Sequence, residues 1–339
     1  MKKFKINSYQ QAGVNLKKVH KIQNTINSLL FKTKNQYTKN FLIGHYAGLF
    51  SFNNTNFCIH TDGVGTKILV AQALKKHNTI GIDAVAMNVN DIVCIGAKPL
   101  VGVDYIALSK EDDKLVNEIF KGLIKGCQLS GIALVGGETA ILADMFQSKP
   151  NQTSYDLAMS VVGVCQKEIL DGSKIKQGDL IIGLESSGLH SNGFSLARKI
   201  LDIKKWGNKM LTPTKIYSNL VLEILENAKI NGLAHITGGA FSKLSRLGKV
   251  CAKGFLLDSF PEPSGIFKEI YEIISNPIEC YKTFNMGIGF VLVTPPDQEQ
   301  IIFDIATKFK TKAFRVGKII PQRKVILKMD KKEFELANY

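Results

Sequence analysis

Seven consecutive residues of this chain combine a carboxylate, two glycines, a hydroxyl and a lysine: Thr61-Asp62-Gly63-Val64-Gly65-Thr66-Lys67. Glycines allow backbone N–H groups to approach phosphate oxygens, a lysine adds positive charge, and an aspartate can hold the Mg²⁺ that accompanies a nucleotide. The GxxxxGK[ST] spacing of a Walker A loop is absent, and a simple β-turn would explain a lone DGxG sequence as well. The segment is therefore one candidate phosphate site, to be weighed with the rest of the chain.

Two further acidic residues stand in similar settings. Asp91 follows Asn90 in an otherwise apolar stretch, where burying an unpaired carboxylate costs on the order of several kcal/mol, so it either pairs with a neighbour or faces a metal. Glu138 follows a pair of glycines. Because Mg²⁺ on a triphosphate takes oxygen ligands from several chain segments, the candidate metal ligands are Asp62, Asp91 and Glu138.

A third candidate lies in the second half of the chain, where the loop Ser186-Ser187-Gly188-Leu189-His190-Ser191-Asn192-Gly193 precedes an expected helix. Its hydroxyls, amide and imidazole could bind a phosphate or a substrate oxygen, and His190 could carry a proton near neutral pH. A capped helix with a surface histidine is the plainer alternative. Likewise, the segment Ala234-His235-Ile236-Thr237-Gly238-Gly239 is either a second anion loop or a turn from strand to helix.

Strands and helices must alternate to position these motifs. Hydrophobic periodicity and β-branched clusters predict strands at 57–60, 100–107, 132–135, 157–165 and 180–184, and helices at 16–31, 68–76, 83–96, 114–130 and 194–201. A tight turn is expected at Gly136-Gly137-Glu138-Thr139. The pattern is typical of the α/β class, with one domain over residues 1–170 and a second over 171–339.

Composition narrows the class of protein. The 339 residues are 45% hydrophobic and 22% charged, enough for two packed domains, and no apolar run is long enough to span a membrane. The net charge of +15 comes from scattered lysines without the interleaved aromatics of a nucleic-acid surface. With six separated cysteines, no CxxC pair and no secretory leader, we expect a cytoplasmic protein that binds neither nucleic acid nor membrane.

Taken in order, these segments resemble the phosphoribosylformylglycinamidine cyclo-ligase family, also called aminoimidazole ribonucleotide synthetase. The resemblance runs from residue 8 to about 290 and rests on Ser8-Tyr9 through Val14, Thr61 through Lys67, Gly81 through Asp91, Gly96 through Tyr105, Gly136 through Ala140, Tyr155 through Ala158, His190 through Gly193, Leu211 through Thr214, His235 through Gly239, and Thr283 through Gly289. Ten ordered segments are far more specific than any single motif. Asn15 and Ala240 depart from the family, which usually has aspartate and glycine at these positions.

The resemblance implies an enzyme that uses ATP and Mg²⁺ to close formylglycinamidine ribonucleotide into 5-aminoimidazole ribonucleotide, releasing ADP and phosphate. It implies a homodimer in which the N-terminal half-sheets of two chains pair into a barrel. The implied site residues are His190, Asp62 and Asp91 for catalysis; Gly63, Gly65, Thr66, Lys67, Asn90, Gly136 and Gly137 for ATP; Ser191, Asn192, Thr237 and Gly238 for the substrate; and Asp62, Asp91 and Glu138 for the metal. The alternatives are a small-molecule kinase of the same superfamily, which would release its phosphorylated substrate intact, and a nucleotide-binding or RNA-associated protein without turnover.

Overall fold

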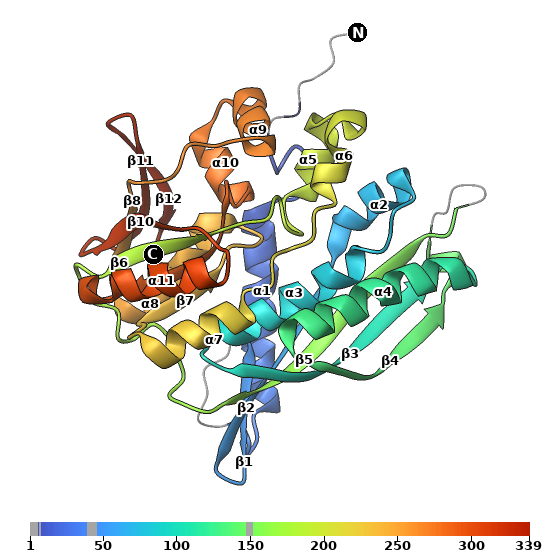
Figure 1. Cartoon of the computed structure of the whole chain (residues 1–339), viewed down its shortest axis with the longest axis horizontal. Coiled ribbons are helices and arrows are strands. Elements are labelled where there is room, and N and C mark those ends of the chain that lie inside the picture. The colour runs from blue at the N-terminus through green and yellow to red at the C-terminus, as the bar shows by residue number, and fades with distance from the viewer. Residues whose placement is uncertain (1–5, 7, 39–45, 147–151) are drawn as a thin grey trace.

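The computed structural model describes residues 6, 8–38, 46–146 and 152–339 and contains two mixed β-sheets, one in each half of the chain (Figure 1). The first sheet has the strand order β1 (Gly48–Phe52), β2 (Thr55–Gly63), β5 (Tyr155–Cys165), β3 (Lys98–Leu108) and β4 (Ala133–Ile141). Strands β3 and β4 are parallel, and the other neighbours are antiparallel. The two parallel strands need a crossover connection, which the helix between them provides.

The face of the first sheet that carries the core is covered by α3 (Ile80–Val93) and α4 (Asp113–Ser130), and α3 lies in the middle of the molecule (Figure 1). The side chain of Asp112 begins α4 by accepting a hydrogen bond from the Leu115 N–H at 3.0 Å. The two helices pack closely because Gly81 has no side chain: a Cβ there would lie 2.1 Å from the Leu123 nitrogen. Since α3 contacts α4, the first sheet and α7 of the second half, it is buried on nearly all sides, its polar residues included.

The opposite face of the first sheet carries exposed apolar side chains. Ile59 is 45% exposed, and Val103 and Tyr105 are each 42% exposed. In the strand register, Tyr105 pairs with Glu138, so both project from this open face. Asp62 pairs with the buried Met159 and projects from the other face, toward α3.

The second sheet has the order β12 (Lys332–Asn338), β11 (Lys324–Met329), β8 (Gly254–Leu257), β10 (Ala313–Ile320), β6 (Leu180–Glu185), β9 (Ile288–Thr294) and β7 (Gly232–His235). The remaining helices are α1 (Leu16–Leu30), α2 (Ile68–Leu74), α5 (Phe194–Ile200), α6 (Ile203–Met210), α7 (Ser218–Asn227), α8 (Ser245–Cys251), α9 (Ile266–Ile274), α10 (Pro277–Thr283) and α11 (Glu299–Lys308). Among the described residues, no helix is both long and apolar enough to cross a membrane.

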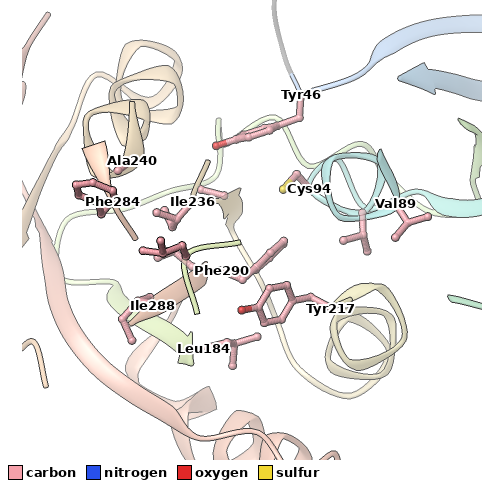
Figure 2. Close-up of a cluster of buried hydrophobic side chains, with 14 of the residues drawn as sticks. Tyr46, Val89, Cys94, Leu184, Tyr217, Ile236, Ala240, Phe284, Ile288 and Phe290 are labelled. Atoms are coloured by element: carbon pink, nitrogen blue, oxygen red, sulfur yellow. The ribbon is translucent and has the colours of Figure 1, made fainter. Parts of the chain in front are cut away.

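A cluster of buried side chains joins the two halves. Figure 2 shows Tyr217 and Phe290 between Val89 of α3 and Leu184 of β6. The ring centroids of Tyr217 and Phe290 are 5.3 Å apart and the ring planes are tilted by 42°, which is a favourable aromatic arrangement. The cluster fixes α3, and with it Asn90 and Asp91, against the second sheet.

The structure confirms the α/β class and contains a helix or strand at each predicted position, with ends shifted by a few residues. The tight turn predicted at 136–139 is wrong, because β4 continues through these residues to Ile141. Hydrogen bonding to β3 keeps the chain extended here despite the two glycines, since Gly136 and Gly137 pair with Val103 and Asp104.

Candidate active site

A cavity of about 980 Å³ lies where the first sheet meets the second half of the chain. Its lining includes two carboxylates of the first half, Asp62 and Asp91, and two cations of the second half, Lys243 and Arg246. Tyr46 also lines the cavity, with the Arg246 guanidinium 5.5 Å from its ring centre. A cavity with facing charges of both signs suits a phosphorylated, metal-bound ligand better than an apolar one.

Asp91 is held by two histidines. Its Oδ1 lies 2.7 Å from His235 Nδ1, and its Oδ2 lies 3.4 Å from His60 Nε2. His60 Nδ1 in turn lies 3.0 Å from Asn88 Oδ1. Burial alone would raise the pKa of Asp91, but the hydrogen bond and charge of His235 outweigh it and hold the pKa below its ordinary value. Asp91 is therefore an ionised carboxylate fixed in position by both halves of the chain.

Asp62 has the opposite electrostatic environment. Burial and the negative charge of Asp91 raise the pKa of Asp62, although His60 and a hydrogen bond from the Gly63 N–H at 2.8 Å counteract them. A divalent cation bound beside two such carboxylates reduces the electrostatic repulsion between them. Mg²⁺ is usually bound by one or two carboxylates plus phosphate oxygens, so Asp62 and Asp91 fit a Mg²⁺–nucleotide.

Glu138 does not join these two residues within one chain. It projects from the open face of the first sheet, and its strand is three positions from that of Asp62, or about 14 Å at the usual strand spacing. Among the described residues, no group of three His, Cys, Asp or Glu side chains could hold a metal ion. Within one chain the strand register therefore keeps Glu138 on the other face of the sheet, apart from Asp62, and its expected role as a metal ligand stays a prediction.

Lys67 is turned away from the cavity. Its Nζ is buried against Asp83, at 2.9 Å from Oδ1, and donates to the Thr212 carbonyl at 2.7 Å. Its neighbour Thr66 lies with Oγ1 3.4 Å from Ser195 Oγ. Gly65 is exposed and has φ +71°, in the left-handed region that favours glycine. The structure thus gives Lys67 a role in joining the two halves.

Asn90, Gly136 and Gly137 lie in different environments. Asn90 is buried: its Oδ1 accepts from the Tyr217 N–H at 2.8 Å, and its Nδ2 donates to the Lys215 carbonyl at 2.9 Å. It therefore connects α3 to the segment before α7. The two glycines lie in β4, where Gly137 covers the carboxylate of Asp104 and Gly136 has open space beside it.

His190 is completely buried and has φ +60°. The Ser187 N–H donates to its Nε2 at 3.3 Å, so the ring proton of the neutral form is on Nδ1, which has no partner among the described residues. Burial, followed by the charges of His235 and Lys67, lowers the pKa of His190 well below its ordinary value. His190 is therefore a neutral imidazole at pH 7, and it is not among the residues that line the cavity.

The loops around Asn192 and Gly238 lie against each other. A Cβ at Gly238 would be 3.4 Å from Asn192 Oδ1, and Ser191 Oγ lies 3.4 Å from Thr214 Oγ1. Thr237 is buried and its Oγ1 accepts from Lys243 Nζ. The structure thus brings together the four residues expected to bind the substrate. Ala240, which replaces a usual glycine, has φ +40°, so the backbone here retains a conformation that favours glycine.

Sequence reasoning missed three members of this site: His60, Lys243 and Arg246. His60 directly precedes the first motif, and Lys243 follows Thr237 by six residues. Both spacings are visible in the sequence, but neither indicates that the side chains meet Asp91 and Asp62 in one cavity. That arrangement depends on packing between the two sheets.

Comparison with known proteins shows the family of this chain. The family described as AIR synthase related protein, N-terminal domain, matches residues 44–165, and its C-terminal domain matches residues 176–330. The phosphoribosylformylglycinamidine cyclo-ligase of Pyrococcus horikoshii is 41% identical over 330 residues, covering 93% of this chain and 96% of the relative. That of Methanococcus maripaludis is 43% identical over 329 residues, covering 92% of each chain.

Solved structures with the same fold are more distant in sequence. The thiamine monophosphate kinase of Aquifex aeolicus superimposes with a TM-score of 0.66 at 17% identity, covering 95% of this chain and 99% of that one. A hydrogenase maturation protein of E. coli gives a TM-score of 0.65 at 14% identity, covering 83% and 85%. These likenesses support the two-domain fold alone.

Proposed function

The chain belongs to the phosphoribosylformylglycinamidine cyclo-ligase family, and on this premise we propose how its residues perform the reaction of that family. The reaction is the ATP-dependent closure of formylglycinamidine ribonucleotide to 5-aminoimidazole ribonucleotide in purine biosynthesis. Phosphorylating the formyl oxygen converts a poor leaving group into phosphate, and an amidine nitrogen then attacks the formyl carbon. The observation that carries the assignment is the cavity in which Asp62 and Asp91 face Lys243 and Arg246 across the junction of the two halves.

Asp62 and Asp91 are the residues we assign to the metal. Mg²⁺ bound there would neutralise the charge of the ATP phosphates. Asp91 keeps its position through His235 and His60, and its depressed pKa keeps it ionised at neutral pH. Gly63, Gly65 and Thr66, at the end of β2 and after it, are assigned to the phosphates, Gly65 and Thr66 through their backbone N–H groups.

Ser191, Asn192, Thr237 and Gly238 are assigned to the substrate. Their two loops meet beside α3, where Asn192 Nδ2 lies 3.9 Å from Met87 Sδ, so a ribonucleotide held by them would lie next to ATP bound at Asp62 and Asp91. We propose that His190, as a neutral imidazole, offers its Nδ1–H as a hydrogen-bond donor near these loops. The residues therefore act mainly by orienting two anionic substrates and neutralising their charge.

We also propose that two chains form a homodimer through the open face of the first sheet. The exposed Ile59, Val103 and Tyr105 form an apolar face that pairing of two half-sheets would cover. We infer domains over residues 1–170 and 171–339, and action in the cytoplasm, where the six cysteines, all free in the structure, would stay reduced.

The experiment that tests the function uses purified protein with formylglycinamidine ribonucleotide, ATP and Mg²⁺, and measures the aminoimidazole product and inorganic phosphate. We expect equal amounts of both, and no product in the presence of EDTA. A phosphorylated substrate released without ring closure would instead identify a small-molecule kinase, and ATP binding without turnover would leave only a nucleotide-binding role.

A further inference from the structure

We propose that Lys243 contacts the phosphoryl group as it passes from ATP to the formyl oxygen of the substrate. This inference rests on the proposed function, because it requires ATP at Asp62 and Asp91 and the substrate at the loops of Asn192 and Gly238. No motif and no part of the resemblance pointed to Lys243.

The position of Lys243 supports this role. It lies in the short 3-10 helix Ala240–Leu244, directly after the Gly238-Gly239 loop, and its Nζ donates to Thr237 Oγ1. It also lines the 980 Å³ cavity together with Asp62 and Asp91. Lys243 thus belongs to both the proposed substrate loop and the proposed ATP site, so we expect a phosphoryl group that moves from one to the other to pass close to its ammonium.

Among the described residues, the charge of Lys243 is not balanced by a directly paired carboxylate, since its hydrogen-bond partner, Thr237 Oγ1, is neutral. It makes no ion pair with any carboxylate in the part of the chain that the structure describes, although Asp91 and Asp62 are near enough to act on its charge. Burial and the nearby Arg246 lower the pKa of Lys243 to about 8, and the two aspartates act in the opposite direction. Burying a cation without a paired anion is energetically unfavourable, so such a cation binds an incoming anion strongly.

The chemistry needs such a cation. In the first step the bond between the γ-phosphorus and the bridging oxygen of ATP breaks, its electron pair leaves with ADP, and the formyl oxygen forms the new bond to phosphorus. In the second step the amidine nitrogen attacks the formyl carbon, phosphate leaves with the electrons of the C–O bond, and the nitrogen loses a proton. Negative charge is spread over the phosphoryl oxygens in both steps, where a fixed ammonium stabilises it.

The test compares Lys243→Met and Lys243→Arg with the control Lys249→Met, which changes an exposed lysine on the neighbouring helix α8. We expect Lys243→Met to lower kcat by about 10²- to 10³-fold, Lys243→Arg to restore part of it, and Lys249→Met to match the wild type. Binding of ADP and of a non-hydrolysable ATP analogue is measured by calorimetry with Mg²⁺. We expect Lys243→Met to weaken the analogue about tenfold or more while ADP binds as before, because only the analogue carries the γ-phosphoryl group.

A structural role predicts a different result. If Lys243 only holds the Thr237 loop, Lys243→Met will weaken ADP and the analogue equally or leave kcat within about threefold of the wild type, and either result overturns the inference. A failure of the proposed function gives a different result, because the wild-type protein would then form no ring product. The binding of the ATP analogue compared with ADP would still show whether Lys243 contacts the γ-phosphoryl group.

Discussion

Lys67 and Asp83 form an ion pair in which both side chains are fully buried, with Nζ 2.9 Å from Oδ1 and 2.8 Å from Oδ2. The pair is shared with the second half of the chain: Lys67 also donates to the Thr212 carbonyl, and Asp83 Oδ1 accepts from both the backbone N–H and the hydroxyl of Thr214. Lys67, which the resemblance predicts to bind ATP, therefore connects the two domains in this structure.

The first prediction concerns this pair. Lys67→Met leaves the Asp83 carboxylate buried without its cation, so we expect the free energy of unfolding to fall by about 3–5 kcal/mol. Urea denaturation measures the change, with the exposed Lys76→Met as a control expected to stay within about 0.5 kcal/mol of the wild type. If the Lys67→Met protein is as stable as the wild type but binds ATP poorly, the result would instead support the prediction that Lys67 binds phosphate.

The second prediction concerns the metal site. Asp62→Asn removes one of two repelling carboxylates, so we expect the melting temperature to stay the same or rise while turnover falls by about 10²-fold or more. Asp156→Asn is a matched control, because Asp156 also accepts a hydrogen bond from the next backbone N–H but lies exposed on β5. Wild-type turnover in Asp62→Asn would remove this residue from the site.

The sequence predicts the elements of this fold better than the contacts between them. Alternation of apolar residues is local, so the strands and helices around Asp62 and Asp91 were predictable. The partner of Asp91 was not, since His235 is 144 residues away. The strand before Glu138 was predictable, but the face of the sheet from which the Glu138 side chain projects depends on the register of β4 with β3. Burial of Lys67 depends on Thr212 of the other domain, which no local pattern indicates.

The third prediction concerns pH. Burial lowers the pKa of His190, so the folded protein keeps this ring neutral while the unfolded chain takes up a proton below about pH 6.5. The contribution of His190 to stability is therefore complete above that pH and is lost as pH falls toward the folded pKa. We expect the free energy of unfolding of the wild type to fall, between pH 6.5 and 5, more steeply than that of His190→Gln, by up to about 1.4 kcal/mol per pH unit.

Urea titrations of both proteins at several pH values measure the two slopes. His77, whose pKa burial also lowers, is present in both and cancels in the comparison. Equal slopes would mean that His190 takes up its proton in the folded state as readily as in the unfolded chain.

The fourth prediction concerns the dimer. Val103 is 42% exposed on the open face of the first sheet, where a charge would be buried on pairing. We expect light scattering after size-exclusion chromatography to give about twice 37.4 kDa for the wild type and 37.4 kDa for Val103→Lys. Val250→Lys, on α8 and 41% exposed, should leave the mass unchanged. A wild-type protein that is monomeric at micromolar concentration would contradict the proposed pairing.

The last prediction separates two neighbouring glycines of β4. A Cβ at Gly137 would lie 2.2 Å from Asp104 Oδ1 and 2.9 Å from the Asp104 backbone oxygen, whereas a Cβ at Gly136 meets nothing within 4 Å. We therefore expect Gly137→Ala to lower the free energy of unfolding by about 1–3 kcal/mol and Gly136→Ala to leave it nearly unchanged. Because Gly136→Ala is sterically neutral in the free protein, its kinetics report on the ligand. If ATP phosphates approach the backbone at Gly136, the KM of the Gly136→Ala variant for ATP will rise while its stability is unchanged. An unchanged KM would show that Gly136 is not part of the ATP site and serves only as a residue of strand β4.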